Sequence, residues 1–168
     1  MKYRLRKWEA GDEKQCREGF KLAYQPLLDE CPEDYRPIVQ VFIDGVVERA
    51  FDGMPEYFAQ KDSISVTVAD VGDSVVGYID TWLVAPSVAQ IGNVFVIPSA
   101  RRQGVASALM DEAERHAREN GASEVILSTG HLLIESHAMY IRRGYQLTAT
   151  VASELRREVT WLKMSKAL

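Results

Sequence analysis

The sequence predicts a mixed α/β (α+β) fold: a central, mostly antiparallel mixed sheet of about seven strands with helices on both faces. Short β-branched runs alternate along the chain with segments whose apolar residues recur at helical spacing. The sequence Val-Gly-Asp-Ser at 71–74 lies between two of these runs and is typical of a hairpin turn. No internal repeat, low-complexity tract or Pro/Gly/Ser-rich linker interrupts the chain, so residues 1–168 are expected to form a single domain.

The amino-terminal part is expected to supply a strand followed by a pair of helices. Residues 3–8 alternate weakly and favour a strand. Apolar residues at helical spacing follow Asp12, and Pro26 is expected to bend or end that helix, because proline cannot donate the helical hydrogen bond. A further helix is expected after Pro37.

The remainder of the chain is expected to alternate between strands and helices. The clearest pattern is an amphipathic helix whose apolar face carries Val105, Leu109 and Ala113, with Gly121 as its C-terminal stop. The other expected elements are strands at 63–70, 75–84, 91–97, 124–128, 145–151 and 158–165 and a short helix at about 133–142. The predicted order is therefore β-α-α-β-β-β-α-β-α-β-β.

Composition and charge narrow the class of protein. Hydrophobic residues make up 46% and charged residues 26%, a globular balance, and no apolar run approaches the ~20 residues that cross a bilayer. The net charge is −4, and the sequence shows no basic cluster of the kind that binds nucleic acid. Cys16 and Cys31 lack metal-ligand spacing and are interpreted as reduced thiols, and the first residues resemble no signal peptide, so a cytoplasmic protein is expected.

The charge is unevenly distributed. Residues 29–62 carry nine acidic side chains against three basic ones. One interpretation is a solvated helix surface, and the other is an acidic lip that attracts a cationic ligand.

The most informative segment is residues 94–107, Val-Phe-Val-Ile-Pro-Ser-Ala-Arg-Arg-Gln-Gly-Val-Ala-Ser. A buried strand stops at Pro98, a basic turn follows, and a helix begins near Gly104. The free amides of a helix N-terminus attract anions, and small residues let a pyrophosphate approach the backbone. A phosphate site and an ordinary helix start both fit this pattern, whereas a Walker loop and a dinucleotide fingerprint are absent from the sequence.

Two segments resemble the signatures of the GNAT superfamily of acyl-coenzyme A-dependent N-acetyltransferases. The first is Arg101-Arg102-Gln103-Gly104-Val105-Ala106, which is similar to the family's Arg/Gln-x-x-Gly-x-Gly/Ala sequence after a strand that ends Val-x-Pro. The second is the segment 136–145, which resembles a later helix ending Tyr-x-x-x-Gly-Phe/Tyr. The resemblance covers about residues 63–168, and over residues 1–62 it depends only on a strand followed by helices.

The resemblance implies acetyl-coenzyme A (acetyl-CoA) as co-substrate, with no metal, and it assigns the residues that bind it. Val94, Phe95 and Val96 would pair with the pantetheine arm through backbone groups, like an added strand. Ser136 and Arg143 would line the cofactor channel. The pyrophosphate would be held by Arg101, Arg102, Gln103, Gly104, Val105, Ala106 and Ser107.

This sequence departs from the family pattern at two positions. The family often has Asn where this chain has Leu133, so a pantetheine hydrogen bond is expected to be missing. It often has Glu where this chain has Gln90, and Gln cannot accept a proton, so the usual general base is absent.

The expected catalytic residues are Tyr140 and Asp80. Tyr140 matches the tyrosine that faces the thioester sulfur, and we expect it to stabilise the leaving thiolate mainly by donating a hydrogen bond. Asp80 is the candidate general base, directly or through water, with a purely structural carboxylate and catalysis by ordered water as the alternatives. A backbone N–H near Phe95 or Val96 would stabilise the oxyanion.

The predicted function is the transfer of an acetyl group from acetyl-CoA to a primary amine, which attacks the thioester directly. The alternative is a catalytically weak or inactive acyl-CoA-binding module, a sensor, which Gln90 and Leu133 favour and Tyr140 disfavours. The expected acceptor is a small-molecule or peptide amine, with no nucleic-acid or membrane partner. A homodimer is left open.

Overall fold

Seven strands form one sheet in the order β1-β2-β3-β4-β5-β7-β6 in the computed structural model, which describes residues 2–51, 64–152 and 159–168. Neighbouring strands are antiparallel except β4 and β5, which are parallel. The strands are β1 (Arg4–Lys7), β2 (Ile64–Val71), β3 (Ser74–Ala85), β4 (Val88–Val96), β5 (Glu124–Gly130), β6 (Gln146–Ala152) and β7 (Thr160–Ala167). The α-helices are α1 (Glu13–Glu30), α2 (Arg36–Phe51), α4 (Val105–Glu119) and α5 (Ile134–Arg142).

The predicted fold class and element order are confirmed by the described residues. The hairpin between β2 and β3 turns on Gly72 and Asp73, whose φ angles of 53° and 67° suit a tight two-residue turn. The strand expected at 91–97 begins already at Val88, because Ala85 pairs with Val88 and extends the hairpin between β3 and β4.

Of the two outcomes expected at Pro26, a bend or an end of the helix, the end is wrong. Pro26 lies inside α1, which continues to Glu30. Proline deprives the carbonyl four residues earlier of its helical partner, but Leu22 at that position is exposed, so its carbonyl can bond to water instead.

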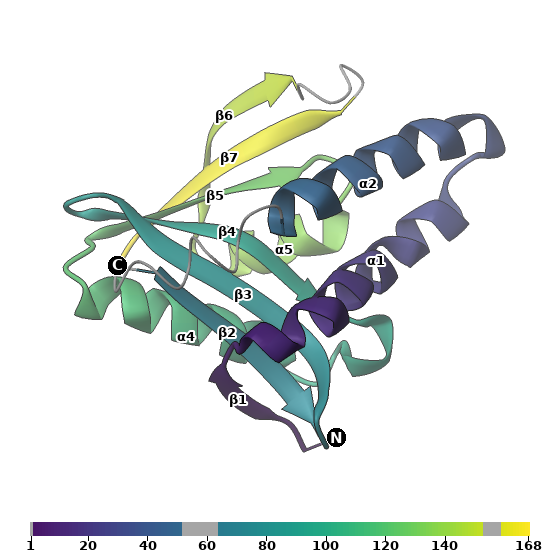
Figure 1. The fold of residues 1–168 in the computed structure, drawn as a ribbon. Helices are drawn as coiled ribbons and strands as arrows, with labels where there is room; N and C mark the ends of the chain where they lie inside the picture. The colour runs from purple at the N-terminus through teal and green to yellow at the C-terminus, as the bar shows by residue number, and fades with distance from the viewer. Residues whose placement is uncertain (1, 52–63, 153–158) are drawn as a thin grey trace.

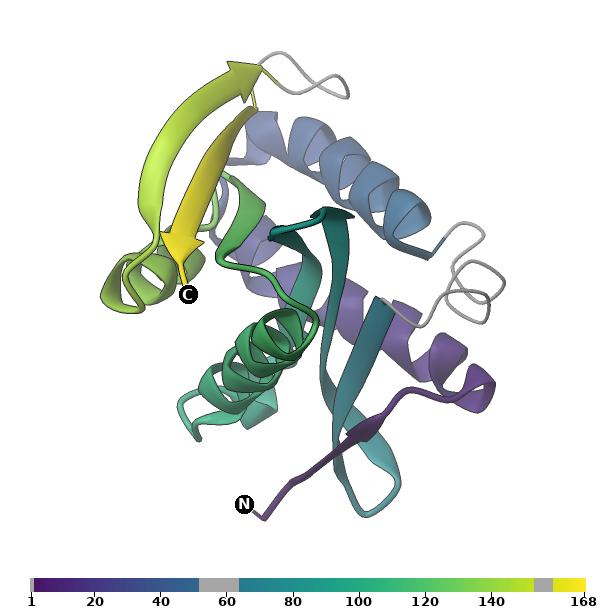
Figure 2. The ribbon, with the colours of Figure 1, turned by 90° about the vertical axis from the view of Figure 1, so that its left-hand side faces the viewer.

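The helices cover both faces of the sheet. Figures 1 and 2 show α1 and α2 side by side on one face and α4 and α5 on the other. One buried cluster joins α1 and α2 to the sheet through Phe20, Phe42 and Phe95. The second joins α4 and α5 to the opposite face through residues that include Leu109 and Tyr140.

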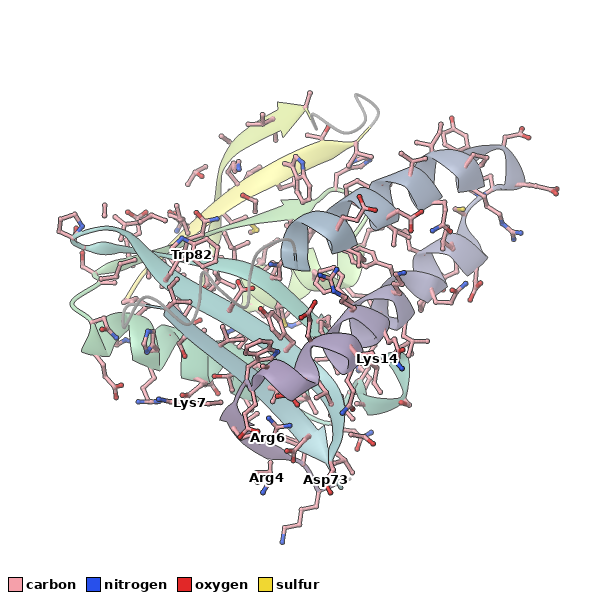
Figure 3. The ribbon with its side chains drawn as sticks, viewed as in Figure 1. Arg4, Arg6, Lys7, Lys14, Asp73 and Trp82 are labelled. Carbon is pink, nitrogen blue, oxygen red and sulfur yellow. The ribbon has the colours of Figure 1, made fainter. Side chains whose placement is uncertain are left out.

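Ion pairs attach the short strand β1 to β2. Asp70 accepts from Arg4 at 2.8 Å and from Arg6 at 2.6 Å, and Arg6 also contacts Asp12 at 2.6 Å. The Arg4 guanidinium holds the pKa of the Asp70 carboxyl below its usual range. Arg4 and Arg6 therefore act as structural residues at this end of the sheet, where Figure 3 shows them near Asp73.

Candidate active site

The strands β4 and β5 separate at their carboxyl ends. Their parallel pairing runs from Val88 opposite Glu124 to Ile91 opposite Leu127, and the described register pairs them no further. β4 continues to Val96 and β5 to Gly130. We call residues 92–96 of β4 and 128–130 of β5 the strand fork. The carboxyl ends of parallel strands are where α/β sheets bind ligands, so the fork is the candidate site.

A β-bulge in β4 accounts for the fork. Pairing with β3 passes from Val94 opposite Ile79 to Ile91 opposite Thr81, so two residues of β4, Gly92 and Asn93, stand opposite Asp80 alone. In a regular parallel ladder the Asn93 amide would bond to β5. Here it donates to Asp80 Oδ1 at 2.8 Å, so the ladder to β5 ends.

Buried side chains fix the bulge. Asp80 Oδ2 accepts from the Tyr78 hydroxyl at 2.8 Å and from the Asn93 side-chain amide at 3.1 Å. A Cβ on Gly92 would overlap Asp80 Oδ1 and the Trp82 ring, so only glycine fits there. Trp82 is half-buried over this position and lies at the opposite end of β3 from Asp73 (Figure 3). No sequence pattern indicated a role in the site for Tyr78, Gly92 or Asn93.

The bulge also decides which backbone groups of β4 face the fork. Ile97 N–H donates to Val76 O at 3.0 Å, and antiparallel alternation then makes Tyr78 and Phe95 the next hydrogen-bonded pair. The backbone groups of Val94 and Val96 consequently point away from β3, into the fork. Phe95 was also predicted to offer its backbone groups to the ligand, but these groups face β3. Its ring stacks on that of Tyr78 at a centroid distance of 5.8 Å.

The helix α4 begins beside the end of β4 with uncapped amides. Gly104 is its N-cap with φ 83°, Arg102 has φ 61°, and no side chain accepts a hydrogen bond at the cap. Free amides at a helix N-terminus form an anion site. Val105 is buried, so it can offer only backbone groups, and Ala106 is half-buried. The predicted residues with exposed side chains here are Arg102, Gln103 and Ser107.

Arg101 connects this helix start to the fork. Its guanidinium donates to Ala23 O of α1 at 2.6 Å and to Val96 O at 3.2 Å, and it lies 3.8 Å from Glu135. Gln103 donates to Ser99 O at 3.1 Å. The structure thus places a positive charge at the carboxyl end of β4, where a phosphate bound at the start of α4 would benefit from it.

Tyr140 belongs to α5 and to the buried cluster that includes Val125 and Leu127 of β5. Its side chain is 4% exposed, and its ring contacts Tyr145 edge to face at 5.8 Å. Burial raises the pKa of the Tyr140 phenol, and the neighbouring Tyr24 raises it further. Within the described part of the chain, no hydrogen-bond partner of its hydroxyl is present.

Asp80, the candidate general base, is wholly buried. Its exposed fraction is 0%, and both carboxylate oxygens accept the hydrogen bonds that fix the bulge. Burial raises the pKa of Asp80, against the hydrogen bonds from Asn93 and Tyr78, which lower it. To remove a proton from a substrate, Asp80 would need an amine or a water to reach atoms that are enclosed here. Its role as a base stays a prediction.

Ser136 and Arg143 differ in position. Ser136 is half-buried in the first turn of α5. Arg143 follows α5 and faces α4, where it contacts Asp111 at 2.6 Å and the buried Glu114 at 3.1 Å. Its charge is therefore already paired, and a contact with the cofactor stays a prediction.

The described residues also bear on metals and membranes. They contain no group of three or more His, Cys, Asp or Glu side chains placed to hold a metal ion. In the same ranges, no helix has the length and hydropathy needed to cross a bilayer.

Comparisons with known proteins agree with this geometry. The model of the acetyltransferase (GNAT) family matches residues 19–145. Human N-acetyltransferase 8 is 35% identical over 86 residues, which are 48% of this chain and 38% of that protein, so the match spans well under half of the relative. The uncharacterised N-acetyltransferase YhfO of Bacillus subtilis is 26% identical over 138 residues, covering 79% of this chain and 88% of that protein.

Solved structures show the same fold at low identity. The PaiA N-acetyltransferase of Thermoplasma acidophilum, in complex with coenzyme A, gives a TM-score of 0.75 at 18% identity over 100% of both chains. The ribosomal-protein-S18-alanine N-acetyltransferase of Escherichia coli gives 0.69 at 14% identity, over 99% of this chain and 94% of that one. The fold and the fork define an acetyltransferase scaffold, and the chain belongs to the GNAT family of acetyltransferases.

Proposed function

We propose that this protein transfers an acetyl group from acetyl-CoA to the nitrogen of a primary amine, which attacks the thioester directly. The observation that carries this proposal is the fork, where the backbone groups of Val94 and Val96 point away from β3, beyond the last β4–β5 pair and beside the uncapped start of α4. The PaiA structure was solved with coenzyme A, and this likeness supports the same ligand here.

The residues present fit the parts of coenzyme A. The free edge of β4 suits the amides of the pantetheine arm, which would add to it like a strand. The amides of residues 104–107 and the charges of Arg101 and Arg102 suit the pyrophosphate. When bound, acetyl-CoA supplies the activated acyl group, and the protein orients it.

The protein's own groups can stabilise the charges that develop in the reaction. The amides of Val94 and Val96 face the fork, so one of them can donate to the oxyanion, whereas the Asn93 amide is committed to Asp80. Tyr140 can donate a hydrogen bond to the leaving sulfur. The proton of the amine passes to water or to Asp80, and the enclosure of Asp80 favours water.

The acceptor is proposed to be a small-molecule or peptide amine. The residues expected to recognise it belong to α1, α2 and the segment up to residue 62. Asp29, Glu30, Glu33 and Asp34 are exposed at the connection between α1 and α2, where the helices extend past the sheet (Figure 1). This position favours a solvated surface over an acidic lip, and the acids at 52, 56 and 62 lie outside the described residues.

The test is the release of free thiol from acetyl-CoA in the presence of a panel of amines: a polyamine, an aminoglycoside, lysine, and peptides with free N-termini. We expect thiol release that depends on one class of amine, with the acetylated product identified by mass spectrometry. Binding of acetyl-CoA without amine-dependent release would contradict enzymatic turnover.

The alternative function is an acyl-CoA sensor that binds without turnover. It is favoured by Asp80, whose carboxylate is closed to the fork, and by Gln90 at the place of the family's usual base. The sensor would bind acetyl-CoA in calorimetry and release no thiol with any amine.

A further inference from the structure

A buried hydroxyl near the end of β5 has no partner. Thr129 is 2% exposed, and its Oγ1 is the one buried side-chain polar atom without a hydrogen bond in the part of the chain that the structure describes. Proteins rarely bury a hydroxyl unpaired, because its lost hydration is not replaced. Valine has the same shape and would fill the same space without this cost, so the hydroxyl requires an explanation.

The position of Thr129 supplies one. It lies just beyond Leu127, the last residue of β5 that pairs with β4, and so belongs to the strand fork. Its backbone is opposite Leu162 of β7, which leaves the side chain as its free group. Because side chains alternate along a strand, Thr129 shares a face with Val125 and Leu127.

That face is the one covered by α4 and α5, where Tyr140 also lies. Val125, Leu127 and Tyr140 belong to the same buried cluster, under α4 and α5. The unpaired hydroxyl is therefore on the β5 side of the fork, while the backbone groups of Val94 and the N–H of Val96 are on the β4 side; the Val96 carbonyl already accepts from Arg101. Polar groups from both strands of the fork suit a ligand that carries amides.

We propose that Thr129 binds ligand in the fork. Its hydroxyl forms the hydrogen bond that it lacks here with an amide of the pantetheine arm of coenzyme A. This proposal depends on the proposed function. A hydroxyl both donates and accepts, so it can bind either the N–H or the C=O of an amide. Thr129 thus provides from β5 what the edge of β4 provides from the other side.

The experiment compares Thr129→Val with the parent by calorimetry against two ligands. Coenzyme A carries the pantetheine arm, and adenosine 3′,5′-bisphosphate lacks it. We expect affinity for coenzyme A to fall about three- to tenfold, the effect of one neutral hydrogen bond, and affinity for the bisphosphate to stay within twofold. The unliganded variant should melt no lower than the parent, because no hydrogen bond within the protein is lost.

Thr81→Val is the matched control. Thr81 is also buried, but its hydroxyl donates to Gln90 O at 2.9 Å. This variant should melt lower than the parent and bind coenzyme A within twofold of it.

The outcomes separate this inference from the proposed function. Unchanged affinity of Thr129→Val for coenzyme A, equal losses for both ligands, or a melting temperature lowered as in Thr81→Val would each overturn the role of Thr129. A parent protein that binds no coenzyme A would overturn the proposed function itself.

Discussion

Replacing Tyr140 by phenylalanine tests how the protein manages the leaving sulfur. The change keeps the ring, which packs on Tyr145 at 5.8 Å, and removes the hydroxyl alone. The hydroxyl has no partner among the described residues, so its removal leaves no protein group unsatisfied. We therefore expect an unchanged thermal midpoint and an unchanged affinity for coenzyme A.

The effect on turnover follows from the ionisation of the phenol. A free thiol titrates near 8.5 and a phenol near 10, so proton transfer from tyrosine to thiolate is uphill by about 1.5 units, or ~2 kcal/mol. Burial raises the pKa of Tyr140 above its ordinary value and makes the transfer less favourable still. The phenol then acts as a hydrogen-bond donor to a developing charge, worth about 1.5–3 kcal/mol. Its loss should slow turnover roughly 10- to 150-fold.

The assay is thiol release at saturating acetyl-CoA and amine. Tyr145→Phe is the control, because the Tyr145 hydroxyl donates to the buried Glu114 at 3.3 Å, outside the fork. We expect this control to lower the thermal midpoint and to keep turnover within about threefold of the parent. If Tyr140→Phe turns over within threefold of the parent, the phenol is a packing group and water stabilises the sulfur.

Three further predictions concern the helix start, the bulge and the acceptor. Gly104→Asp places a carboxylate and a Cβ at a residue with φ 83°, where the phosphate is proposed to bind. Calorimetry on the folded variant should show that its affinity for coenzyme A is at least tenfold weaker, a loss of about 1.4 kcal/mol. An affinity equal to that of the parent would exclude a phosphate site here. Burial raises the pKa of Asp80 above its unfolded value, so the folded chain keeps this proton to a higher pH than the unfolded chain. The free energy of unfolding therefore falls as the pH rises between the two pKa values, by at most about 1.4 kcal/mol per pH unit. Asp80→Asn should lack this contribution, and denaturation curves that stay parallel to those of the parent across acidic pH would contradict it. If the acids of residues 29–62 attract a cationic acceptor, added salt should lower kcat/KM for the amine more than kcat, and a KM that ignores ionic strength would count against the acidic lip.

The fold could be predicted from the sequence because its patterns are local. The amphipathic period of α4, the Gly72–Asp73 turn and the stop at Gly121 each lie within a short window, and all appear as expected. The expectation that Pro26 could end its helix was wrong, because the local rule for proline does not include the solvent that can bond to the freed carbonyl.

The site could be predicted only in part, because the bulge is not a local feature. It depends on Asp80 and Asn93, which are 13 residues apart and meet only once β3 and β4 pair. One extra residue in β4 shifts its alternation, which is why Val94 and Val96 face the fork while the backbone of Phe95 faces β3. A role for Thr129 could not be predicted for another reason. Threonine and valine are equivalent in a strand pattern, and only the structure shows that the Thr129 hydroxyl is unpaired.

The capture of the Asn93 amide by Asp80 has a consequence for the speed and cost of binding. The Asn93 amide is bonded to β3 and the β4–β5 ladder ends at Ile91, so an incoming arm has no interstrand ladder to break before it can bond to Val94 and Val96. The strand fork is preorganised, because its conformational entropy is lost when the chain folds rather than when the ligand binds. Such a protein binds in the conformation it already holds, so association should be a single concentration-dependent phase without a slow opening step.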